Sequence, residues 1–381
     1  MKIIHVEDYF DPTAGYQINE LLYASKDFDN EVYLITSDDM SPFHKRVDIS
    51  QDKKFEEETD VKLIRLKSLF KLSSRLILKD FIKTINSINP DVIFMHGIAD
   101  FKDLTLLKRK QEFKIVRDCH MSWVAAKNRF RKLFYFFYKL TFANIINKTD
   151  KYQKIYALGN EELEYLHKIG IKDKKIDMLP HGFNDDIMYY DKKARQKLRK
   201  KLNIKDNIVI SYIGKLNKSK KPDLLINIVN ELDKEFINDY NISLLFIGPQ
   251  NKQYMNTFNE KLNSLNFELE YRVEDSKPFR ELRKYFSASD IMIFPKQTTL
   301  SSIHAQICGC PVIMEDHKSN KERVINNDNL YPENNFKKAA NILKRLIENH
   351  EYIKEKNLNN REILSEREYK NQINKLYNDL E

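Results

Sequence analysis

Two lysines in the second half of the chain have the spacing expected of an anion site. Lys215 and Lys220 lie in SYIGKLNKSKKPDLLI, after an apolar run and just before the amphipathic stretch that begins at Asp223. Two ammonium groups beside a helix N-terminus suit a diphosphate, because their charges and the backbone N–H groups both stabilise negative charge. Gly214 would form the turn that opens this site. A solvated lysine cluster in a lysine-rich chain is the alternative interpretation.

Residues at the ends of other apolar runs add candidates. His120 follows the run FKIVRDC, Gly15 follows the first run of the chain, and Gly248 closes the run LLFIG. Ligands of open α/β sheets bind beyond the carboxyl ends of the strands, so these residues would face a ligand. A histidine there suits sugar positioning and charge stabilisation. A packed histidine and two ordinary loop glycines are the alternative.

Residues 293–313 read IFPKQTTLSSIHAQICGCPVI, which predicts a strand, a polar turn, a helix and a second strand. The segment carries Lys296 and His304 but no carboxylate. We expect Leu300, Ser301 and Ser302 to present backbone N–H groups at the helix start. Lys296 can only donate hydrogen bonds, so it suits an anionic partner, whereas a neutral His304 suits a hydroxyl. A His304 that only packs in the core is the alternative.

The stretch 123–148 is basic and aromatic and contains no acidic residue. Helical spacing would place Phe130, Phe134, Phe137 and Phe142 roughly on one side. The basic residues that could then reach anionic lipid head groups are Arg129, Arg131, Lys132 and Lys139. A core-packed helix with a solvated basic edge is the alternative. Nucleic acid is a disfavoured partner, because no RNA-binding or DNA-binding module surrounds the stretch.

The elements that must position these residues follow one pattern, in which apolar runs alternate with stretches of helical period. The 381 residues are too many for one ordinary core. The runs at 2–6, 31–37, 61–66, 91–95, 113–117, 153–158 and 175–179 predict one doubly wound α/β domain over 1–183. Those at 207–213, 242–247, 268–273, 290–294 and 311–314 predict a second over 184–357. We expect a helical tail at 358–381 to pack back on the first domain.

Composition narrows the class of protein. The three cysteines, Cys119, Cys308 and Cys310, are too few for a disulfide framework and predict a reduced, cytoplasmic setting. No signal peptide and no apolar run of the roughly 18 residues needed to cross a bilayer are expected. The net charge of +9 suits anionic partners. No ligand cluster for a metal is evident, so none is expected.

Together these landmarks resemble the retaining GT-B glycosyltransferases of the group 1 type, usually numbered family four. The Pro-x-x-Gly-Gly turn of that family is matched by Pro12, Ala14 and Gly15. Its Gly-Arg-Leu segment with a following lysine is matched by Gly214, Lys215, Leu216 and Lys220. The Pro-Asn-Gly-Val and Ala-Cys-Gly-x-Pro-Val-Ile segments are matched by residues 180–183 and 307–313. The order and spacing of these short motifs carry the resemblance.

The resemblance implies a GT-B fold with two doubly wound Rossmann-like domains facing a central cleft. It also implies transfer of a sugar, with retention, from a nucleoside-diphosphate sugar to a lipid-linked or cell-surface saccharide. Lys215 and Lys220 would hold the diphosphate and His120 would position the sugar, with no metal or other cofactor. We expect such an enzyme to be cytoplasmic and peripheral on the anionic inner face of the membrane.

The resemblance breaks in the segment 293–313. The family carries two glutamates separated by seven residues, and those positions fall here on Lys296 and His304. One hypothesis is an active enzyme with altered donor preference. The other is a catalytically silent GT-B protein that binds a nucleotide or glycan and assists a surface-polysaccharide assembly complex. We favour activity, because Lys215, Lys220 and His120 stand at the expected positions.

Overall fold

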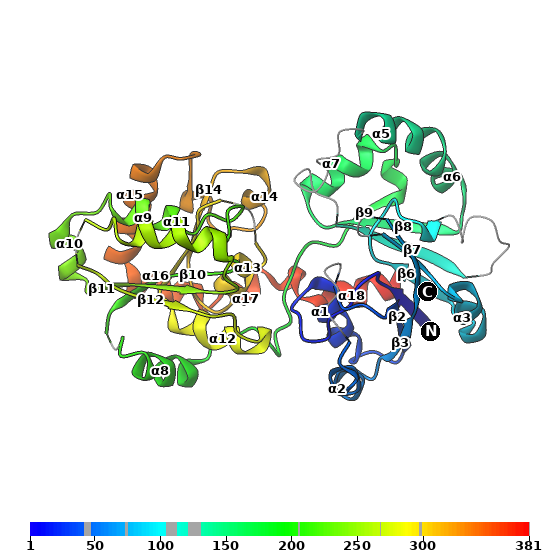
Figure 1. The fold of residues 1–381 in the computed structure, drawn as a ribbon, viewed down its shortest axis with the longest axis horizontal. Coiled ribbons are helices and arrows are strands. Elements are labelled where there is room, and N and C mark those ends of the chain that lie inside the picture. Colours follow the sequence, from blue (N-terminus) through cyan, green and yellow to red (C-terminus); the bar gives the residue numbers. More distant parts are fainter. Residues whose placement is uncertain are drawn as a thin grey trace. The chain divides into compact units, whose positions relative to one another are not determined.

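The computed structural model describes the whole chain except residues 42–46, 73–74, 104–112, 121–130, 205, 267, 297–298 and 381. It forms two compact units (Figure 1). Unit 1 comprises Met1–His181 and Tyr369–Glu381, and unit 2 comprises Gly182–Glu368. The chain therefore crosses from one unit to the other twice, and the end of the predicted tail belongs to unit 1 while its beginning belongs to unit 2.

A parallel sheet of seven strands forms the centre of unit 1, in the order β3-β2-β1-β6-β7-β8-β9. Its strands are β1 (Lys2–Val6), β2 (Glu31–Ser37), β3 (Lys62–Leu66), β6 (Val92–Met95), β7 (Lys114–Cys119), β8 (Tyr152–Ala157) and β9 (Ile176–Met178). An antiparallel hairpin, β4 (Ser68–Leu72) and β5 (Arg75–Leu78), stands outside this sheet. The alternation of apolar runs predicts the parallel sheet but not the hairpin.

Helices cover both faces of the sheet of unit 1. They are α1 (Gln17–Ser25), α2 (Ile49–Thr59), α3 (Phe81–Ile88), α5 (Arg131–Leu140), α6 (Phe142–Lys148), α7 (Asn160–Lys168) and α18 (Tyr369–Asn378). Figure 1 shows α5, α6 and α7 on one side and α1, α2 and α18 on the other. This arrangement explains why the strands read as continuous apolar runs, since neither face meets water.

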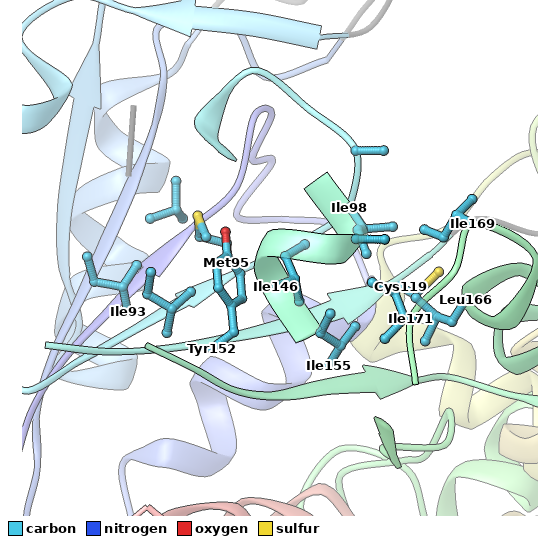
Figure 2. Close-up of a cluster of buried hydrophobic side chains, with 14 of the residues drawn as sticks. Ile93, Met95, Ile98, Cys119, Ile146, Tyr152, Ile155, Leu166, Ile169 and Ile171 are labelled. Atoms are coloured by element: carbon cyan, nitrogen blue, oxygen red, sulfur yellow. The ribbon is translucent and has the colours of Figure 1, made fainter. Parts of the chain in front are cut away.

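The core of unit 1 has one layer on each side of the sheet. Figure 2 shows the layer in which Met95, Cys119 and Ile155 of the strands meet Ile146 of α6 and Leu166 of α7. On the other face, α18 packs its Tyr369, Ile373 and Leu376 against sheet residues. The C-terminal helix is thus part of the core of unit 1.

Unit 2 has a second parallel sheet, of six strands, in the order β12-β11-β10-β13-β14-β15. Its strands are β10 (Ile208–Ile213), β11 (Ile242–Ile247), β12 (Glu270–Glu274), β13 (Ile291–Phe294), β14 (Val312–Glu315) and β15 (Leu330–Tyr331). Figure 1 shows α9 (Leu224–Val229) and α11 (Lys252–Leu262) on one side and α8 (Lys192–Lys201) and α12 (Phe279–Ala288) on the other. The remaining helices are α10 (Lys234–Asp239), α13 (Ser301–Ile307), α14 (Lys318–Lys321), α15 (Phe336–Glu348), α16 (His350–Asn357) and α17 (Asn360–Ile363).

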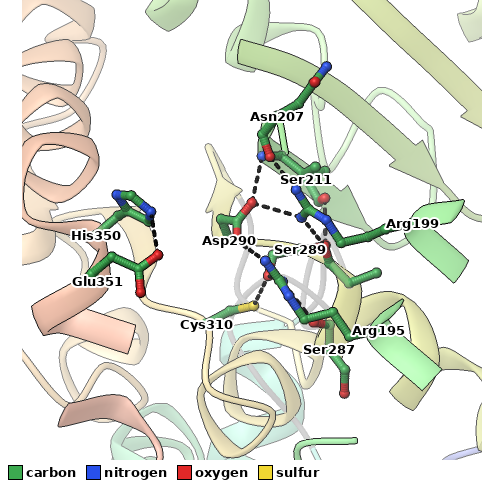
Figure 3. Close-up of polar contacts among 12 residues, drawn as sticks. Arg195, Arg199, Asn207, Ser211, Ser287, Ser289, Asp290, Cys310, His350 and Glu351 are labelled. Atoms are coloured by element: carbon green, nitrogen blue, oxygen red, sulfur yellow. Dashed lines mark hydrogen bonds and ion pairs between the residues drawn. The ribbon is translucent and has the colours of Figure 1, made fainter. Parts of the chain in front are cut away.

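Helix α8 is fastened to this sheet by an ion cluster centred on Asp290 (Figure 3). Nη2 of Arg195 lies 2.5 Å from one carboxylate oxygen of Asp290, and Nη1 of Arg199 lies 3.0 Å from the other. Burial opposes ionisation of Asp290, but the two guanidinium groups hold its pKa below the usual range. The strongly basic helix α8 is therefore part of unit 2.

Both sheets reverse their strand order at one point, next to the first strand of each unit. In unit 1, β2 and β6 lie on either side of β1. In unit 2, β11 and β13 lie on either side of β10. In open α/β sheets, ligands bind at the carboxyl edge beside such a reversal. The topology therefore predicts that ligand-binding residues follow β1 and β6 in unit 1 and β10 and β13 in unit 2.

Candidate functional site

The residues that follow β10 form a loop that is tied to the loop after β11. The Leu216 N–H donates to the Pro249 carbonyl at 2.9 Å, and the Asn251 N–H donates to the Leu216 carbonyl at 3.0 Å. Gly248 has φ +150°, and a Cβ placed on it would lie 1.9 Å from the Gly214 carbonyl oxygen. Gly248 is therefore required by the close approach of two backbones. Its contact with a donor remains a prediction.

Lys220 lies in a tight turn beyond this loop. The side-chain oxygen of Asn217 accepts hydrogen bonds from the N–H groups of Ser219 at 3.2 Å and Lys220 at 3.0 Å. Burial, followed by the charges of Arg323 and Lys215, lowers the pKa of Lys220 to about 8. The turn thus places the Lys220 ammonium within the field of two other cations, and a bound anion would relieve their repulsion.

Arg323 is a member of this cationic group that the sequence analysis missed. It follows α14, and its carbonyl oxygen accepts a hydrogen bond from Nε2 of Gln306 at 2.8 Å. Oε1 of the same Gln306 accepts from the Ile325 N–H at 2.8 Å. Helix α13 therefore fixes the backbone on both sides of Arg323. No motif marks this arginine, because only the fold brings its segment near the loop after β10.

Lys296, which follows β13, is engaged by carboxylates from elsewhere in unit 2. Its Nζ lies 3.0 Å from both carboxylate oxygens of Glu315 and 2.9 Å from Oε1 of Glu333. Burial opposes the effect, but hydrogen bonds to Glu333 and Glu315 raise the pKa of Lys296. The missing carboxylates of segment 293–313 are thus supplied by the end of β14 and by the turn after β15. A ligand contact of Lys296 would have to compete with them.

The beginning of α13 is only partly available to a ligand. Ser301 N–H donates to Oγ1 of Thr299 at 3.4 Å, and both N–H and Oγ of Ser302 donate to the Thr299 carbonyl. Leu300 and Ser301 are half-buried, and Ser302 is buried. The N–H groups of Ser301 and Ser302 therefore already have partners inside the turn. Donor binding by these residues stays a prediction.

His304 is a buried side chain. Its ring lies edge-on to Phe279, with centroids 5.3 Å apart, and 6.2 Å from Phe286. Burial lowers its pKa to about 4, although a hydrogen bond with the backbone of Gly182 acts in the opposite direction. His304 is therefore neutral and packed among aromatic rings. This placement matches the core-packing alternative, and a ribose contact remains untested.

In unit 1, His120 follows β7 and is paired with Asp118. Its Nε2 lies 2.8 Å from Oδ1 of Asp118. Burial alone would lower the pKa of His120, but the Asp118 carboxylate raises it to about 9. The imidazole is therefore a cation at neutral pH, which suits stabilisation of negative charge. Gly15 is half-buried in the loop between β1 and α1, a loop held by a hydrogen bond from Asn19 to the Asp11 carbonyl at 2.9 Å.

Buried polar residues that no sequence motif marks lie behind His120. Nδ1 of His96 lies 2.6 Å from Oδ2 of Asp118, and Nε2 of His96 lies 3.0 Å from Nδ1 of His5. By residue type, His96, Asp118 and His120 could hold a metal ion, and their ligand atoms lie within 4.8 Å of one another. The spacings of 2.6 and 2.8 Å between these atoms are those of hydrogen bonds. We therefore describe the group as a hydrogen-bonded chain.

A buried ion network supports the segment that follows β6. Nζ of Lys102 lies 2.6 Å from Asp8 and 3.2 Å from Asp100, and Nη2 of Arg117 lies 2.8 Å from Asp100. Arg117 also donates through Nε to the Gly97 carbonyl at 2.8 Å. These contacts hold residues from three neighbouring strand ends in fixed positions at the carboxyl edge of the sheet.

Helix α5 carries three of the four predicted lipid contacts. Arg131, Lys132 and Lys139 are exposed, and Arg129 lies outside the described residues, as does Phe130. The expectation that the phenylalanines share one side is wrong for Phe134 and Phe142, which pack against the core of unit 1. The exposed apolar residues of the helix are instead Leu133, Phe136, Phe137 and Leu140. No helix in the described part of the chain is long and apolar enough to span a membrane.

A cavity of about 560 Å³ in unit 2 lies away from the candidate site. Its lining includes Asn207, Ile208 and Asp290, which stand at the amino ends of β10 and β13. The guanidinium groups of Arg195 and Arg199 in its wall already bind Asp290 and backbone carbonyls (Figure 3). The charges of this ion cluster are therefore already paired within the protein. The cavity also lies at the edge of the sheet opposite the candidate site.

The chain is similar to known proteins in sequence over part of its length and in fold over nearly all of it. Residues 194–369 match the family model described as Glycosyl transferases group 1. No curated protein matches the sequence. Among solved structures, Anabaena Alr3699/HepE in complex with UDP and glucose matches with TM-score 0.72 and 15% identity over 100% of this chain and 99% of that one.

Two further solved structures have the same fold. A glycosyltransferase from Rickettsia africae matches with TM-score 0.75 and 14% identity, covering 100% of this chain and 97% of that one. WaaG, a glycosyltransferase involved in lipopolysaccharide biosynthesis, matches with TM-score 0.66 and 14% identity over 99% of each chain. These matches confirm the predicted fold class, two Rossmann-like domains of the GT-B type. Residues 194–369, most of unit 2, are thus similar to the group 1 glycosyltransferases, and the whole chain has the GT-B fold.

Proposed function

We propose that this glycosyltransferase takes its sugar from a nucleoside-diphosphate donor and holds the diphosphate with Lys215, Lys220 and Arg323. The observation that carries the proposal is the group of three cations beside the point where the sheet of unit 2 reverses its strand order. Lys220 and Arg323 are half-buried and Lys215 is exposed, and the proximity of like charges costs free energy. A diphosphate, which carries several negative charges, would turn that repulsion into binding free energy.

These cations would also serve the chemical step. When the bond between the sugar and the phosphate breaks, negative charge grows on the diphosphate. Fixed positive groups around those oxygens lower the barrier, because they are already in place when the charge develops. We propose that transfer occurs with retention and that no metal takes part, as the family resemblance implies. His120, a cation fastened by Asp118, is our candidate for the group that positions the sugar.

The nucleotide is proposed to be a uridine diphosphate. Structures of Anabaena Alr3699/HepE contain UDP or UDP-glucose, and they match this chain over almost its entire length. The acceptor is proposed to be a lipid-linked or cell-surface saccharide, since WaaG is described as acting in lipopolysaccharide biosynthesis. Incubation of the purified protein with UDP-, GDP- and dTDP-sugars tests this. Release of the nucleotide from a UDP-sugar supports the proposal, whereas binding without any turnover would favour the silent binding protein.

We further propose that unit 1 docks on an anionic membrane surface through α5. The exposed apolar residues Leu133, Phe136, Phe137 and Leu140 are accompanied by exposed Arg131, Lys132 and Lys139, and α5 contains no acidic residue. An apolar face between cations is typical of helices that lie in a lipid head-group layer. The β4–β5 hairpin adds exposed Leu69, Phe70 and Leu72, and the guanidinium of its Arg75 lies 5.7 Å from the ring centroid of Phe134 in α5.

A further inference from the structure

Four residues from three neighbouring strands of unit 1 form one hydrogen-bonded chain that ends at His120. His5 lies in β1, His96 directly follows β6, and Asp118 lies in β7. These strands are consecutive in the sheet, so the side chains at their carboxyl ends meet. We propose that His5, His96 and Asp118 are positioning residues that hold His120 in one orientation, in which its Nε2–H donates to Asp118. This proposal rests on the proposed function only for the role of His120 in sugar transfer.

The geometry of the chain is continuous. Nδ1 of His5 lies 3.0 Å from Nε2 of His96, Nδ1 of His96 lies 2.6 Å from Oδ2 of Asp118, and Oδ1 of Asp118 lies 2.8 Å from Nε2 of His120. The ring of Phe94 stacks on that of His96 with centroids 4.4 Å apart, which fixes the plane of the second histidine. His5, His96 and Asp118 are each at most 2% exposed. Because these three side chains are shielded from solvent, water does not compete for the hydrogen bonds among them.

The direction of the protons follows from what each group can donate. A carboxylate only accepts, so His96 carries a proton on Nδ1 and His120 carries one on Nε2. His5 is neutral, because burial holds its pKa well below the usual range. Its Nε2 has no partner among the described residues. A proton there would be a buried donor without an acceptor, so the proton of His5 belongs on Nδ1, which donates to His96.

The carboxylate of Asp118 is therefore held by two groups in addition to His120. His96 donates to Oδ2, and the Gly97 N–H donates to Oδ1 at 2.8 Å. Burial opposes its ionisation, but His120 and His96 hold its pKa well below the usual range. A carboxylate fixed in this way can accept from His120 in only one direction. The other ring nitrogen of His120 is then left for a substrate oxygen, on a side chain that is 37% exposed.

The acidic groups around His120 favour its cationic form. Asp118 in β7 makes the largest contribution, followed by Glu7 after β1 and Glu162 in α7. Burial raises the pKa of Glu7, although the neighbouring His96, Lys102 and His120 act in the opposite sense. The carboxylate of Asp118 is thus the group whose orientation most affects the charge of His120. If His96 and His5 fix that carboxylate, a substitution at His96 or His5 changes the pKa of His120 without altering His120 itself.

The test compares three substitutions and reads the titration of His120 directly, by NMR of protein labelled in histidine. Asp118→Asn removes the carboxylate, His96→Leu removes the donor to it, and His96→Asn keeps an N–H near the position of Nδ1. We expect the pKa of His120 to fall by about two pH units in Asp118→Asn and by about one in His96→Leu. His96→Asn should restore most of the wild-type value. Asp173→Asn, which removes the exposed partner of His167 in the same unit, should leave His120 unchanged.

Activity supplies a second reading that a purely structural role would not give. In His96→Leu we expect kcat for turnover of the UDP-sugar to fall by about tenfold or more, with UDP affinity unchanged, because the nucleotide is proposed to bind unit 2. An unchanged His120 titration in both His96→Leu and Asp118→Asn would overturn the proposal, as would a transition metal bound stoichiometrically to His96, Asp118 and His120. If the wild-type protein shows no turnover, the proposed function fails, yet the titrations still decide this inference.

Discussion

The ammonium of Lys296 lies 3.0 Å from both carboxylate oxygens of Glu315. This pair accounts for the unusual chemistry of segment 293–313, where the family resemblance leads one to expect a glutamate. The charge of Lys296 is balanced inside unit 2 by Glu315, which is almost completely buried, and by the exposed Glu333. A lysine at this position is therefore compatible with a folded donor domain.

Replacing Lys296 by alanine should destabilise the protein. The substitution leaves the carboxylate of Glu315 buried without its cation, and we expect the free energy of unfolding to fall by about 1 to 3 kcal/mol. Chemical denaturation measures this loss. Glu333→Gln is the matched control, because it removes the exposed partner of the same ammonium and should change stability much less. Equal effects of the two substitutions would show that the buried pair does not stabilise the fold.

Donor binding should weaken as pH rises through the pKa of Lys220. That pKa is about 8, because burial and the neighbouring Arg323 and Lys215 disfavour the charged form. A bound diphosphate favours the charged form and so raises the pKa. The affinity for UDP should then fall as pH rises above about 8, by at most about tenfold per pH unit for one proton, until the raised pKa of the bound state is passed.

The same linkage predicts that UDP binding at pH 8 takes up a fraction of a proton. Titration calorimetry in buffers with different ionisation enthalpies measures this uptake. Lys220→Ala should abolish the uptake, whereas Lys218→Ala, which removes an exposed lysine of the same loop, should preserve it. Proton release instead of uptake would contradict the role given to Lys220.

Membrane docking should depend on both the basic and the exposed apolar residues of α5. Flotation with phosphatidylglycerol vesicles should recover the wild-type protein, and pure phosphatidylcholine vesicles should recover less. Replacing Lys132 and Lys139 by alanine should weaken binding to the anionic vesicles by about 1 kcal/mol for each charge. Replacing Phe136 and Phe137 by serine should weaken binding to vesicles of either kind, since these exposed rings provide the apolar contact.

The control for the flotation experiment lies in unit 2. Replacing Lys192 and Lys193 of α8 by alanine removes the same number of exposed charges from a different helix. If this control lowers recovery as much as the α5 variants do, binding reflects net charge alone, and α5 has no special part in it.

The strands of both sheets except β15 could be predicted from the sequence, since a strand buried on two faces reads as a continuous apolar run. Strand β15 has only two residues and forms no such run. The hairpin formed by β4 and β5 was not predictable either, because β4 has no buried residue and β5 is buried only at alternate residues, unlike a strand covered on both faces. The amphipathic stretch that begins at Asp223 forms only a short helix, since α9 ends at Val229 before α10 begins at Lys234.

The candidate site was predictable where one residue stands at the end of a strand, as Lys215 and His120 do. Partners such as Asp118 and Arg323 were not, because their roles depend on which segments become neighbours in the fold. Asp118 stands inside an apolar run, which marks it as buried but does not reveal that His96 lies opposite. Glu315 ends a strand in the same way as the residues that were noticed, so its position alone was an available signal.

The central claim is that unit 2 binds a nucleoside diphosphate through Lys215, Lys220 and Arg323, and equilibrium binding of UDP tests it most directly. The account predicts that UDP binds much more tightly than uridine. It also predicts that Lys220→Ala and Arg323→Ala each weaken UDP binding by about tenfold or more, while Lys218→Ala does not. The contradictory result would be that UDP, GDP and dTDP all fail to bind the wild-type protein, or that UDP binds no better than uridine.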